Sequence, residues 1–203
     1  DNMGVVCFTS GTLILTPTGE VPIDTLRVGD LVQTMDNGAQ AIRWIGTTRL
    51  SLVEQPKLKP IVLKQGVLGL SRDLFVSPQH GIYVPSRNQL VRAKHLVGHM
   101  SGVWVAHDRQ IVTYVHMLLN THEILRANGA FSESFYPGKM ALRMMETPTR
   151  ATLYRALPAL QLGRPARDFY GPTARSFFKP MQVHKGLPGV PLRSSPSARS
   201  WVQ

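Results

Sequence analysis

Three turn dipeptides divide the first 136 residues into short apolar runs, namely Thr18-Gly19, Asn37-Gly38 and Asn128-Gly129. Each dipeptide accepts the positive φ angles of a tight hairpin turn, and the flanking apolar residues follow the pattern of half-buried strands. The chain is therefore constrained to short antiparallel strands joined by tight turns. Its seventeen glycines and fifteen prolines suit that architecture, and 43% hydrophobic residues can fill one substantial core. We predict an all-β fold.

Cys7 is the only cysteine among the 203 residues. A single cysteine forms neither an internal disulfide nor a cysteine-based zinc site, so it is either a small buried hydrophobe or a reactive thiol. For an arbitrary lone cysteine the buried hydrophobe is the better interpretation. Here the residue directly precedes a β-rich stretch, which makes it a candidate nucleophile against its own upstream peptide bond, Val6–Cys7.

A second motif lies seventy residues later, where Ser77 and His80 interrupt the apolar run of residues 74–84. The flanks are typical of β-strands and Pro78 breaks the run into a turn, so both side chains can point into one pocket. A Ser-x-x-His pair is a weak signal by itself, because an isolated histidine is usually structural or solvated. Its combination with Cys7 makes it a candidate site.

A third stretch, residues 114–135, contains two more candidate histidines around the Asn128-Gly129 turn. Either His116 or His122 could complete the pocket, or could merely cap a strand edge. We expect the other four histidines to be solvated, and no spacing among the seven predicts a metal site. We expect no cofactor. The four are His95, His99, His107 and His184.

Taken together, these blocks resemble the Hint domains, the self-processing fold of hedgehog C-terminal domains and inteins. Residues 7–38 resemble the opening block of that family, and Ser77 and His80 resemble its Thr-x-x-His block with serine in place of threonine. Residues 114–135 resemble its terminal hairpin. The overall similarity is to the bacterial hedgehog/intein-like group, which implies a Hint fold over residues 7–136 and a short, basic α-helical extension after it.

The chain departs from this family at two places. Inteins end the terminal hairpin with a His-Asn pair whose asparagine cyclises, whereas Ser132, Glu133 and Ser134 stand at the corresponding place here. Hedgehog domains carry a sterol-activating aspartate between the first two blocks, whereas residues 42–48 contain no carboxylate. We therefore expect neither asparagine-driven splicing nor sterol transfer.

The resemblance implies an N-to-S acyl shift, in which Cys7 attacks the Val6 carbonyl to give a thioester. His80 would hydrogen-bond the scissile nitrogen and protonate it as a general acid, and Ser77 would orient that nitrogen or the carbonyl oxygen. Water, a thiol or an amine would then cleave the thioester. The protein would be a single-turnover, autoproteolytic catalyst acting on its own chain.

Two other interpretations stay open. The missing terminal asparagine and the serine at position 77 also suit a Hint scaffold of attenuated activity that serves as a binding module. The remaining alternative is an unrelated all-β protein whose basic C-terminal part binds polyanions.

The basic charge is concentrated after residue 136. Residues 137–203 carry eleven Lys and Arg against two Asp and Glu, whereas residues 1–136 carry twelve against ten. The charges are scattered and form no recognisable binding module, so we do not expect nucleic-acid binding but allow an acidic partner or an anionic surface. We expect the aromatic residues of this part to anchor it to the core, namely Tyr154, Phe169, Tyr170, Phe177 and Phe178.

Residues 137–185 should form a helical extension. Thr147 resembles an N-cap followed by a first-turn proline, and leucines recur at helical spacing at 153, 157 and 160. Residues 186–203 are rich in Pro, Ser and Gly, and we expect them to be disordered.

Residues 1–6 are interpreted as the remnant of an upstream segment, the partner that cleavage would release. They contain no apolar signal core and no basic leader, and no apolar run approaches the roughly 20 residues that span a bilayer. We expect a soluble protein whose localisation stays open, with secretion or a cell-surface place in a larger bacterial precursor as one option.

Overall fold

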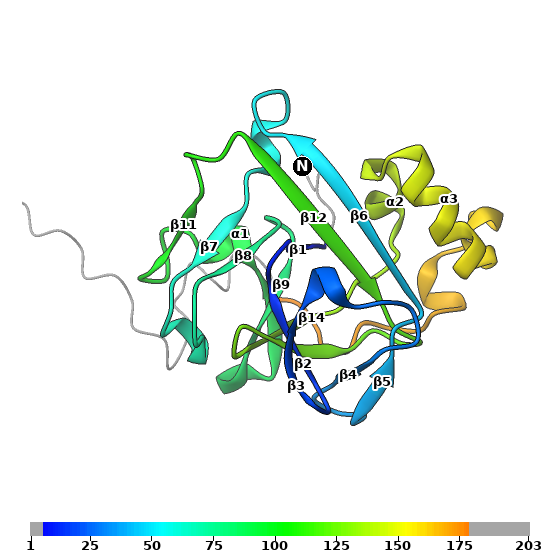
Figure 1. Cartoon of the computed structure of the whole chain (residues 1–203), viewed down its shortest axis with the longest axis horizontal. Coiled ribbons are helices and arrows are strands. Elements are labelled where there is room, and N and C mark those ends of the chain that lie inside the picture. The colour runs from blue at the N-terminus through cyan, green and yellow to red at the C-terminus, as the bar shows by residue number, and fades with distance from the viewer. Residues whose placement is uncertain (1–5, 179–203) are drawn as a thin grey trace, which may run out of the picture.

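Short antiparallel strands are the main regular elements up to residue 133 in the computed structural model, which describes residues 6–178 (Figure 1). They form two six-stranded sheets and one two-stranded sheet. In spatial order the first sheet contains β11 (Val103–Val105), β7 (Ile61–Leu63), β8 (Leu74–Val76), β1 (Phe8–Thr9), β12 (Ile111–Leu118) and β6 (Trp44–Ser51). The second contains β10 (Gln89–Arg92), β9 (Gly81–Val84), β14 (Ala130–Glu133), β13 (Ile124–Ala127), β2 (Leu13–Thr16) and β3 (Gly19–Pro22), and the third β4 (Leu31–Gln33) and β5 (Ala39–Ala41).

All three predicted hairpins are present, but only Asn128-Gly129, between β13 and β14, is a two-residue turn formed by the predicted dipeptide. The turn between β2 and β3 is Pro17-Thr18, because Gly19 already pairs with Thr16, and β4 and β5 are joined by residues 34–38, which end in Asn37-Gly38. At the last turn the φ angles are 47° at Asn128 and 94° at Gly129, as a two-residue hairpin turn requires. The Asn128 side chain also accepts a hydrogen bond from the backbone N–H of Leu13 (2.8 Å), which ties this turn to β2.

Strand β1 is only two residues long, yet it lies in the interior of the first sheet between β8 and β12. Phe8 pairs with Val76 on one side and with Val115 on the other. Because Cys7 directly precedes β1, it is held between the end of β8 and the middle of β12. The fold therefore buries the chain at Cys7 instead of leaving it as a free terminus.

Two clusters of buried apolar side chains form the interior. The first draws residues from both six-stranded sheets, such as Ile14, Leu74, Ile82 and Val115. The second contains Cys7 and lies where the first sheet meets the C-terminal extension; its other buried members are Trp44, Leu52, Leu58, Val112, Tyr114, Leu118, Phe135, Ala141, Met145, Leu153, Leu157, Leu160 and Tyr170.

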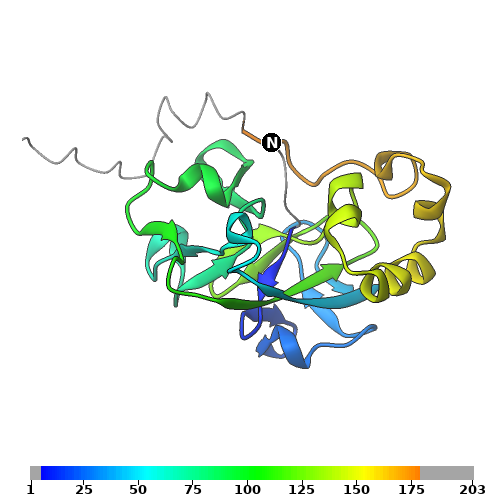
Figure 2. The same ribbon diagram turned by 90° about the horizontal axis from the view of Figure 1, so that it is seen from above.

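The expected helical extension begins with α2 (Lys139–Met144) and α3 (Thr147–Ala156), which lie beside β6 (Figure 2). Thr152 Oγ1 accepts a hydrogen bond from Trp44 Nε1 (3.0 Å), and Thr149 Oγ1 donates one to the Thr47 carbonyl (3.0 Å). The three leucines noted at helical spacing are buried. The predicted N-cap is wrong by one residue, because Glu146 is the cap and makes no side-chain capping bond.

The remaining helical elements are short. They comprise α1 (Ala93–Leu96) and six 3₁₀ turns, namely η1 (Ile23–Thr25), η2 (Pro56–Leu58), η3 (Val67–Gly69), η4 (Pro85–Arg87), η5 (Pro158–Leu162) and η6 (Ala166–Asp168). The last two turns continue the extension from α3 toward a segment that returns to the second sheet.

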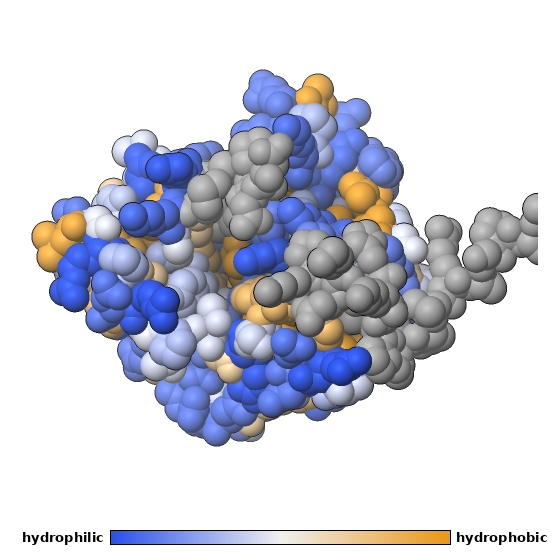
Figure 3. All heavy atoms as spheres, turned by 180° about the vertical axis from the view of Figure 1, so that it is seen from behind, coloured by the Kyte–Doolittle hydropathy of each residue, from blue (hydrophilic) through white to orange (hydrophobic). Residues whose placement is uncertain are grey.

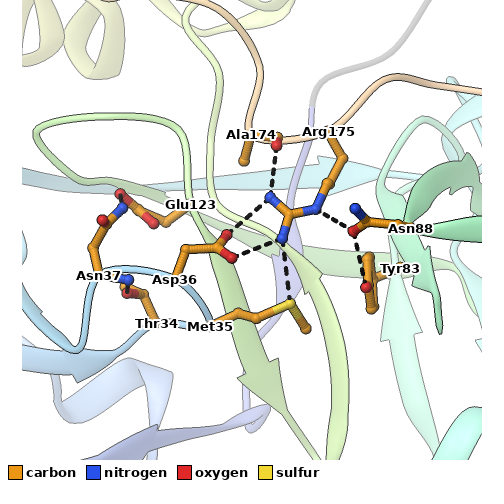
Figure 4. A network of polar contacts seen from close by, with 9 residues as sticks. All are labelled: Thr34, Met35, Asp36, Asn37, Tyr83, Asn88, Glu123, Ala174 and Arg175. Carbon is orange, nitrogen blue, oxygen red and sulfur yellow. Dashed lines mark hydrogen bonds and ion pairs between the residues drawn. The ribbon is translucent and has the colours of Figure 1, made fainter.

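Residues 171–178 run back across the molecule from the helices to β10 (Figure 2). The backbone of Leu90 bonds both the Ser176 carbonyl (2.9 Å) and the Phe178 N–H (2.9 Å), and Phe178 is buried in the first cluster. Arg175 forms a two-pronged ion pair with Asp36 and donates a further hydrogen bond to Asn88 (Figure 4). This returning segment, residues 171–178, therefore links the extension to two β-hairpins.

The aromatic residues of the extension lie against the core as expected. Tyr170 and Phe178 are buried, and Tyr154 and Phe169 pack against the second cluster. The ring of Phe177 stacks under the Arg92 guanidinium (4.3 Å). The expected disordered segment, residues 186–203, lies outside the described residues, as do residues 1–5 of the expected remnant and His184.

Within residues 6–178, no helix combines the length and the apolar character that crossing a bilayer requires. On the face opposite to that of Figure 1, hydrophilic residues predominate and hydrophobic residues appear in separate patches (Figure 3).

The Asn128-Gly129 turn offers a stability test. A Cβ added at Gly129 would lie 2.9 Å from the Ser71 backbone nitrogen and 3.0 Å from the Gly69 carbonyl oxygen, whereas one added at Gly38 would meet nothing within 4 Å. Both glycines have positive φ. We expect Gly129→Ala to lower the free energy of unfolding by about 1–3 kcal/mol more than Gly38→Ala, because only the first also forces neighbouring backbone apart. Urea unfolding of both variants checks this, and equal losses would contradict it.

Candidate active site

The Val6–Cys7 peptide bond is fixed by the turn that contains Ser77. The Cys7 backbone N–H donates a hydrogen bond to Ser77 Oγ (3.0 Å), and the Ser77 N–H donates one to the Cys7 carbonyl (3.0 Å). This turn connects β8 to β9, and Pro78 lies within it as expected. Ser77 therefore holds the nitrogen of the peptide bond that precedes Cys7.

His116, on β12, faces the same peptide bond. Its Nδ1 lies 3.2 Å from Cys7 Sγ and 3.3 Å from the Val6 carbonyl oxygen, while its Nε2 lies 3.3 Å from Thr48 Oγ1. Thr48 is on the neighbouring strand β6, where His116 is opposite Gly46 and Tyr114 is opposite Thr48. The two side chains are thus diagonal neighbours on one face of the sheet.

This arrangement favours one tautomer for contact with the thiol. When Nε2 carries the proton and donates it to Thr48 Oγ1, the Nδ1 lone pair is free to accept the Cys7 thiol proton. Burial lowers the pKa of His116 to about 4, an effect that the Val6 carbonyl partly opposes. His116 is therefore neutral at pH 7, in the form that can act as a base.

The thiol itself is protonated at rest. Cys7 is 2% exposed, and burial raises its pKa well above the ordinary value, although the Ser77 side chain partly opposes this. A protonated thiol is a weak nucleophile, so reaction requires a base close to the sulfur. His116 is placed to serve as that base.

His80 lies at the other end of the Ser77 turn, with its ring 4.5 Å from that of Phe8. It is fully buried, and within the described part of the chain neither ring nitrogen has a hydrogen-bond partner. Burial lowers its pKa to about 4, while the Glu133 carboxylate and the Cys7 backbone oppose that decrease. His80 is therefore neutral at pH 7 and lies close to both Cys7 and Glu133.

His122 contacts a different set of residues. Its Nε2 lies 2.9 Å from Glu133 Oε2, and its Nδ1 accepts a hydrogen bond from the Ala174 N–H (2.8 Å). Because Nδ1 accepts, Nε2 carries the proton and donates it to Glu133. Of the two histidines that the sequence left open, His116 is the one that faces Cys7.

A small cavity adjoins the thiol. Its volume is about 20 Å³, which is enough for about one water molecule. Its walls are Cys7, Thr48, Leu50, Leu58, Ser77, Tyr114 and His116. A small nucleophile could therefore approach the sulfur from this side.

The comparison with known protein families decides the identity of this fold. The Hint domain model matches residues 6–139. The chain belongs to the Hint domain family.

Solved structures with a similar arrangement include intein-like proteins at low sequence identity. A bacterial intein-like domain from Clostridium thermocellum is 16% identical, with a TM-score of 0.48, and the match covers 65% of this chain and 99% of that one. A variant of the Ssp DnaB mini-intein is 10% identical, with a TM-score of 0.46 and coverages of 68% and 99%. The gp41-1 intein is 11% identical, with a TM-score of 0.39 and coverages of 64% and 98%. A search of curated proteins finds no match.

The predicted all-β Hint fold with a short helical extension is confirmed. This Hint domain brings Cys7, Ser77 and His116 together and places His80 beside them, whereas His122 is bonded elsewhere. The roles of these residues stay predictions. No cluster of metal-ligating side chains occurs among the described residues. His107 is exposed as expected, but His95 and His99 are half-buried because α1 and the turn after it pack on the core.

Two contributors were not recognised from the sequence. Thr48 lies in the stretch noted only for its lack of a carboxylate, yet it bonds His116. Glu133 was noted only as a replacement in the terminal hairpin, yet it is 1% exposed and bonds both His122 and the Gly81 N–H (2.6 Å). Strand alternation could have placed Thr48 and His116 on inward faces, but the register between β6 and β12 is not visible in the sequence.

The two neutral buried histidines should make the Hint domain sensitive to acid. Both have an ordinary pKa of 6.5 and a folded-state pKa of about 4, so between these values the unfolded chain binds more protons. Stability should be complete above pH 6.5 and should fall as the pH decreases toward 4, by up to about 3 kcal/mol per histidine. Urea unfolding at pH 7, 6, 5 and 4 measures this loss. His116→Gln should show a shallower dependence, and a flat profile between pH 7 and 5 would refute the assignment.

Proposed function

We propose that this Hint domain cleaves its own chain at Val6–Cys7 by an N-to-S acyl shift. The observation that carries the proposal is the position of His116 Nδ1, within 3.2 Å of the thiol sulfur and 3.3 Å of the Val6 carbonyl oxygen. One neutral nitrogen thus adjoins both the group that must lose a proton and the oxygen that must accept charge.

The first step is attack of Sγ on the carbonyl carbon of Val6. His116 Nδ1 accepts the thiol proton, a C–S bond forms, and the carbonyl π electrons move to the Val6 oxygen. The new Nδ1–H then faces that oxygen and stabilises its negative charge, as a donor in an oxyanion hole does. Thr48 Oγ1 holds the opposite nitrogen, so the ring keeps its orientation throughout this exchange.

The second step breaks the C–N bond and gives a thioester with a free Cys7 amine. Ser77 Oγ holds the departing nitrogen through its N–H and so fixes the plane of the peptide. His80 is the proton donor in this proposal: it takes up a proton from water as negative charge develops and passes it to the nitrogen, while His116 gives the thiol proton to water as the carbonyl re-forms. Overall, one proton leaves sulfur and one arrives at nitrogen, so the exchange with water balances and the shift needs no other co-reactant.

The thioester is then cleaved by water, a thiol or an amine, which releases the segment that precedes Cys7. The cavity beside Cys7 would admit such a small nucleophile. No asparagine is available at Ser134 to cyclise, so the C-terminal side of the domain stays intact. The enzyme would turn over once.

The direct test is the intact mass, followed over time, of a fusion that carries a small folded protein before Asp1. We expect cleavage after Val6 that dithiothreitol or hydroxylamine accelerates, because both nucleophiles intercept a thioester. The Cys7→Ala fusion is the control and should stay whole. A folded wild-type fusion that never cleaves would instead support the attenuated scaffold.

Single substitutions test the assigned roles. We expect His116→Ala and His80→Ala each to slow cleavage by about 10²-fold or more, as loss of a general base or acid does. Ser77→Ala should have a smaller effect, since its hydroxyl contributes about 1–3 kcal/mol of positioning. The rate constants come from the same mass assay, with circular dichroism to show that each variant folds. Equal rates in all three variants would disprove the assignment.

A further inference from the structure

A buried chain of polar groups leads away from His80 and has no part in the mechanism above. Glu133, at the end of β14, accepts the Gly81 N–H with Oε1 (2.6 Å) and the His122 Nε2–H with Oε2 (2.9 Å). Gly81 directly follows His80 in the chain. The carboxylate is therefore bonded to the backbone that positions His80.

Burial of the Glu133 carboxylate is energetically unfavourable. Glu133 is 1% exposed and the His122 side chain is 0% exposed, and burial of an ionised carboxylate costs several kcal/mol unless its hydrogen bonds compensate. A neutral side chain could hold the Gly81 N–H at lower cost. The retained charge points to an electrostatic role.

The negative charge of Glu133 raises the pKa of His80, whereas it is not among the groups that shift the pKa of the Cys7 thiol. His80 is influenced by Glu133 on β14, by His122 before β13 and by the Cys7 backbone before β1. Among these groups the carboxylate favours the protonated imidazole, while burial and His122 disfavour it. Glu133 therefore supports the form of His80 that can donate a proton.

The returning segment fixes the orientation of this network. His122 Nδ1 accepts a hydrogen bond from the Ala174 N–H, so the ring proton is on Nε2, which donates it to Glu133. Arg175 holds Ala174 in place through its bonds to Asp36 and Asn88 (Figure 4). Both partners of Glu133 thus donate a hydrogen bond to its carboxylate.

We propose that Glu133 is a positioning residue for self-cleavage, which holds the turn containing His80 and supports proton donation from His80 to the Cys7 nitrogen. This inference rests on the proposed function. It adds a residue that does not touch the scissile bond and acts through His80, the proposed proton donor.

The test compares Glu133→Gln with a matched control. Gln keeps an oxygen for the Gly81 N–H but removes the charge. Glu123 is also buried in this hairpin region, where its side chain accepts hydrogen bonds from Asn37 and Thr121, neither of which belongs to the turn containing His80. Glu123→Gln thus removes an equally buried charge away from His80.

In the fusion assay at pH 7 we expect Glu133→Gln to cleave about tenfold more slowly than wild type, and Glu123→Gln to cleave at the wild-type rate. The difference between Glu133→Gln and wild type should narrow as the pH approaches 4, because His80 then becomes protonated in both proteins. A structural defect alone would persist at every pH. Equal rates for wild type and Glu133→Gln, or equal slowing in the control, would overturn the inference.

An NMR titration separates this inference from the proposed cleavage. In the Cys7→Ala protein, Glu133→Gln should lower the pKa of His80, whereas Glu123→Gln should leave it unchanged. An unchanged His80 pKa in Glu133→Gln would overturn the inference whether or not the wild type cleaves. A wild-type fusion that fails to cleave while the His80 pKa does shift would reject the proposed function alone.

Discussion

The two hydrogen bonds between Cys7 and Ser77 are the constraint on which the site depends. They join the chain just before β1 to the turn after β8, and the sheet then fixes Phe8 between β8 and β12. At the start of a folded domain, the backbone on either side of a peptide bond would ordinarily rotate freely about φ and ψ. Here the Cys7 N–H and the Cys7 carbonyl are both hydrogen-bonded to Ser77, so the orientation of the Val6–Cys7 peptide bond is fixed. The positions of the other site residues follow from that orientation.

Around this bond the protein keeps polar groups where a stable core would contain apolar ones. His80, His116, His122 and Glu133 are each at most 3% exposed. Such groups weaken a fold unless they are satisfied, and buried groups with displaced pKa values concentrate at functional sites. Within the described residues, neither ring nitrogen of His80 has a partner in good hydrogen-bond geometry, although the nearby Cys7 backbone raises its pKa, so the ring is available for a proton transfer.

The sequence was sufficient for the features that local chemistry determines. The Asn128-Gly129 turn follows from the need for positive φ, and the burial of Leu153 in α3 follows from helical spacing. What it could not supply was register. Whether His116 or His122 faces Cys7 depends on how β12 aligns with β1, and the contact of Thr48 with His116 depends on how β6 aligns with β12. The Glu146 cap was missed because it makes no side-chain bond that a sequence pattern could reveal.

The second apolar cluster places Cys7 in one packed unit with the helices of the extension. Trp44 joins the two directly, since its ring stacks near His116 (6.2 Å) while its nitrogen bonds Thr152 on α3. The folded unit therefore extends beyond residue 139, where the Hint match ends, to Phe178. A shortened version of this domain that ended at residue 139 would lose the helices that complete the apolar cluster around Cys7 and the returning segment that pairs with Leu90.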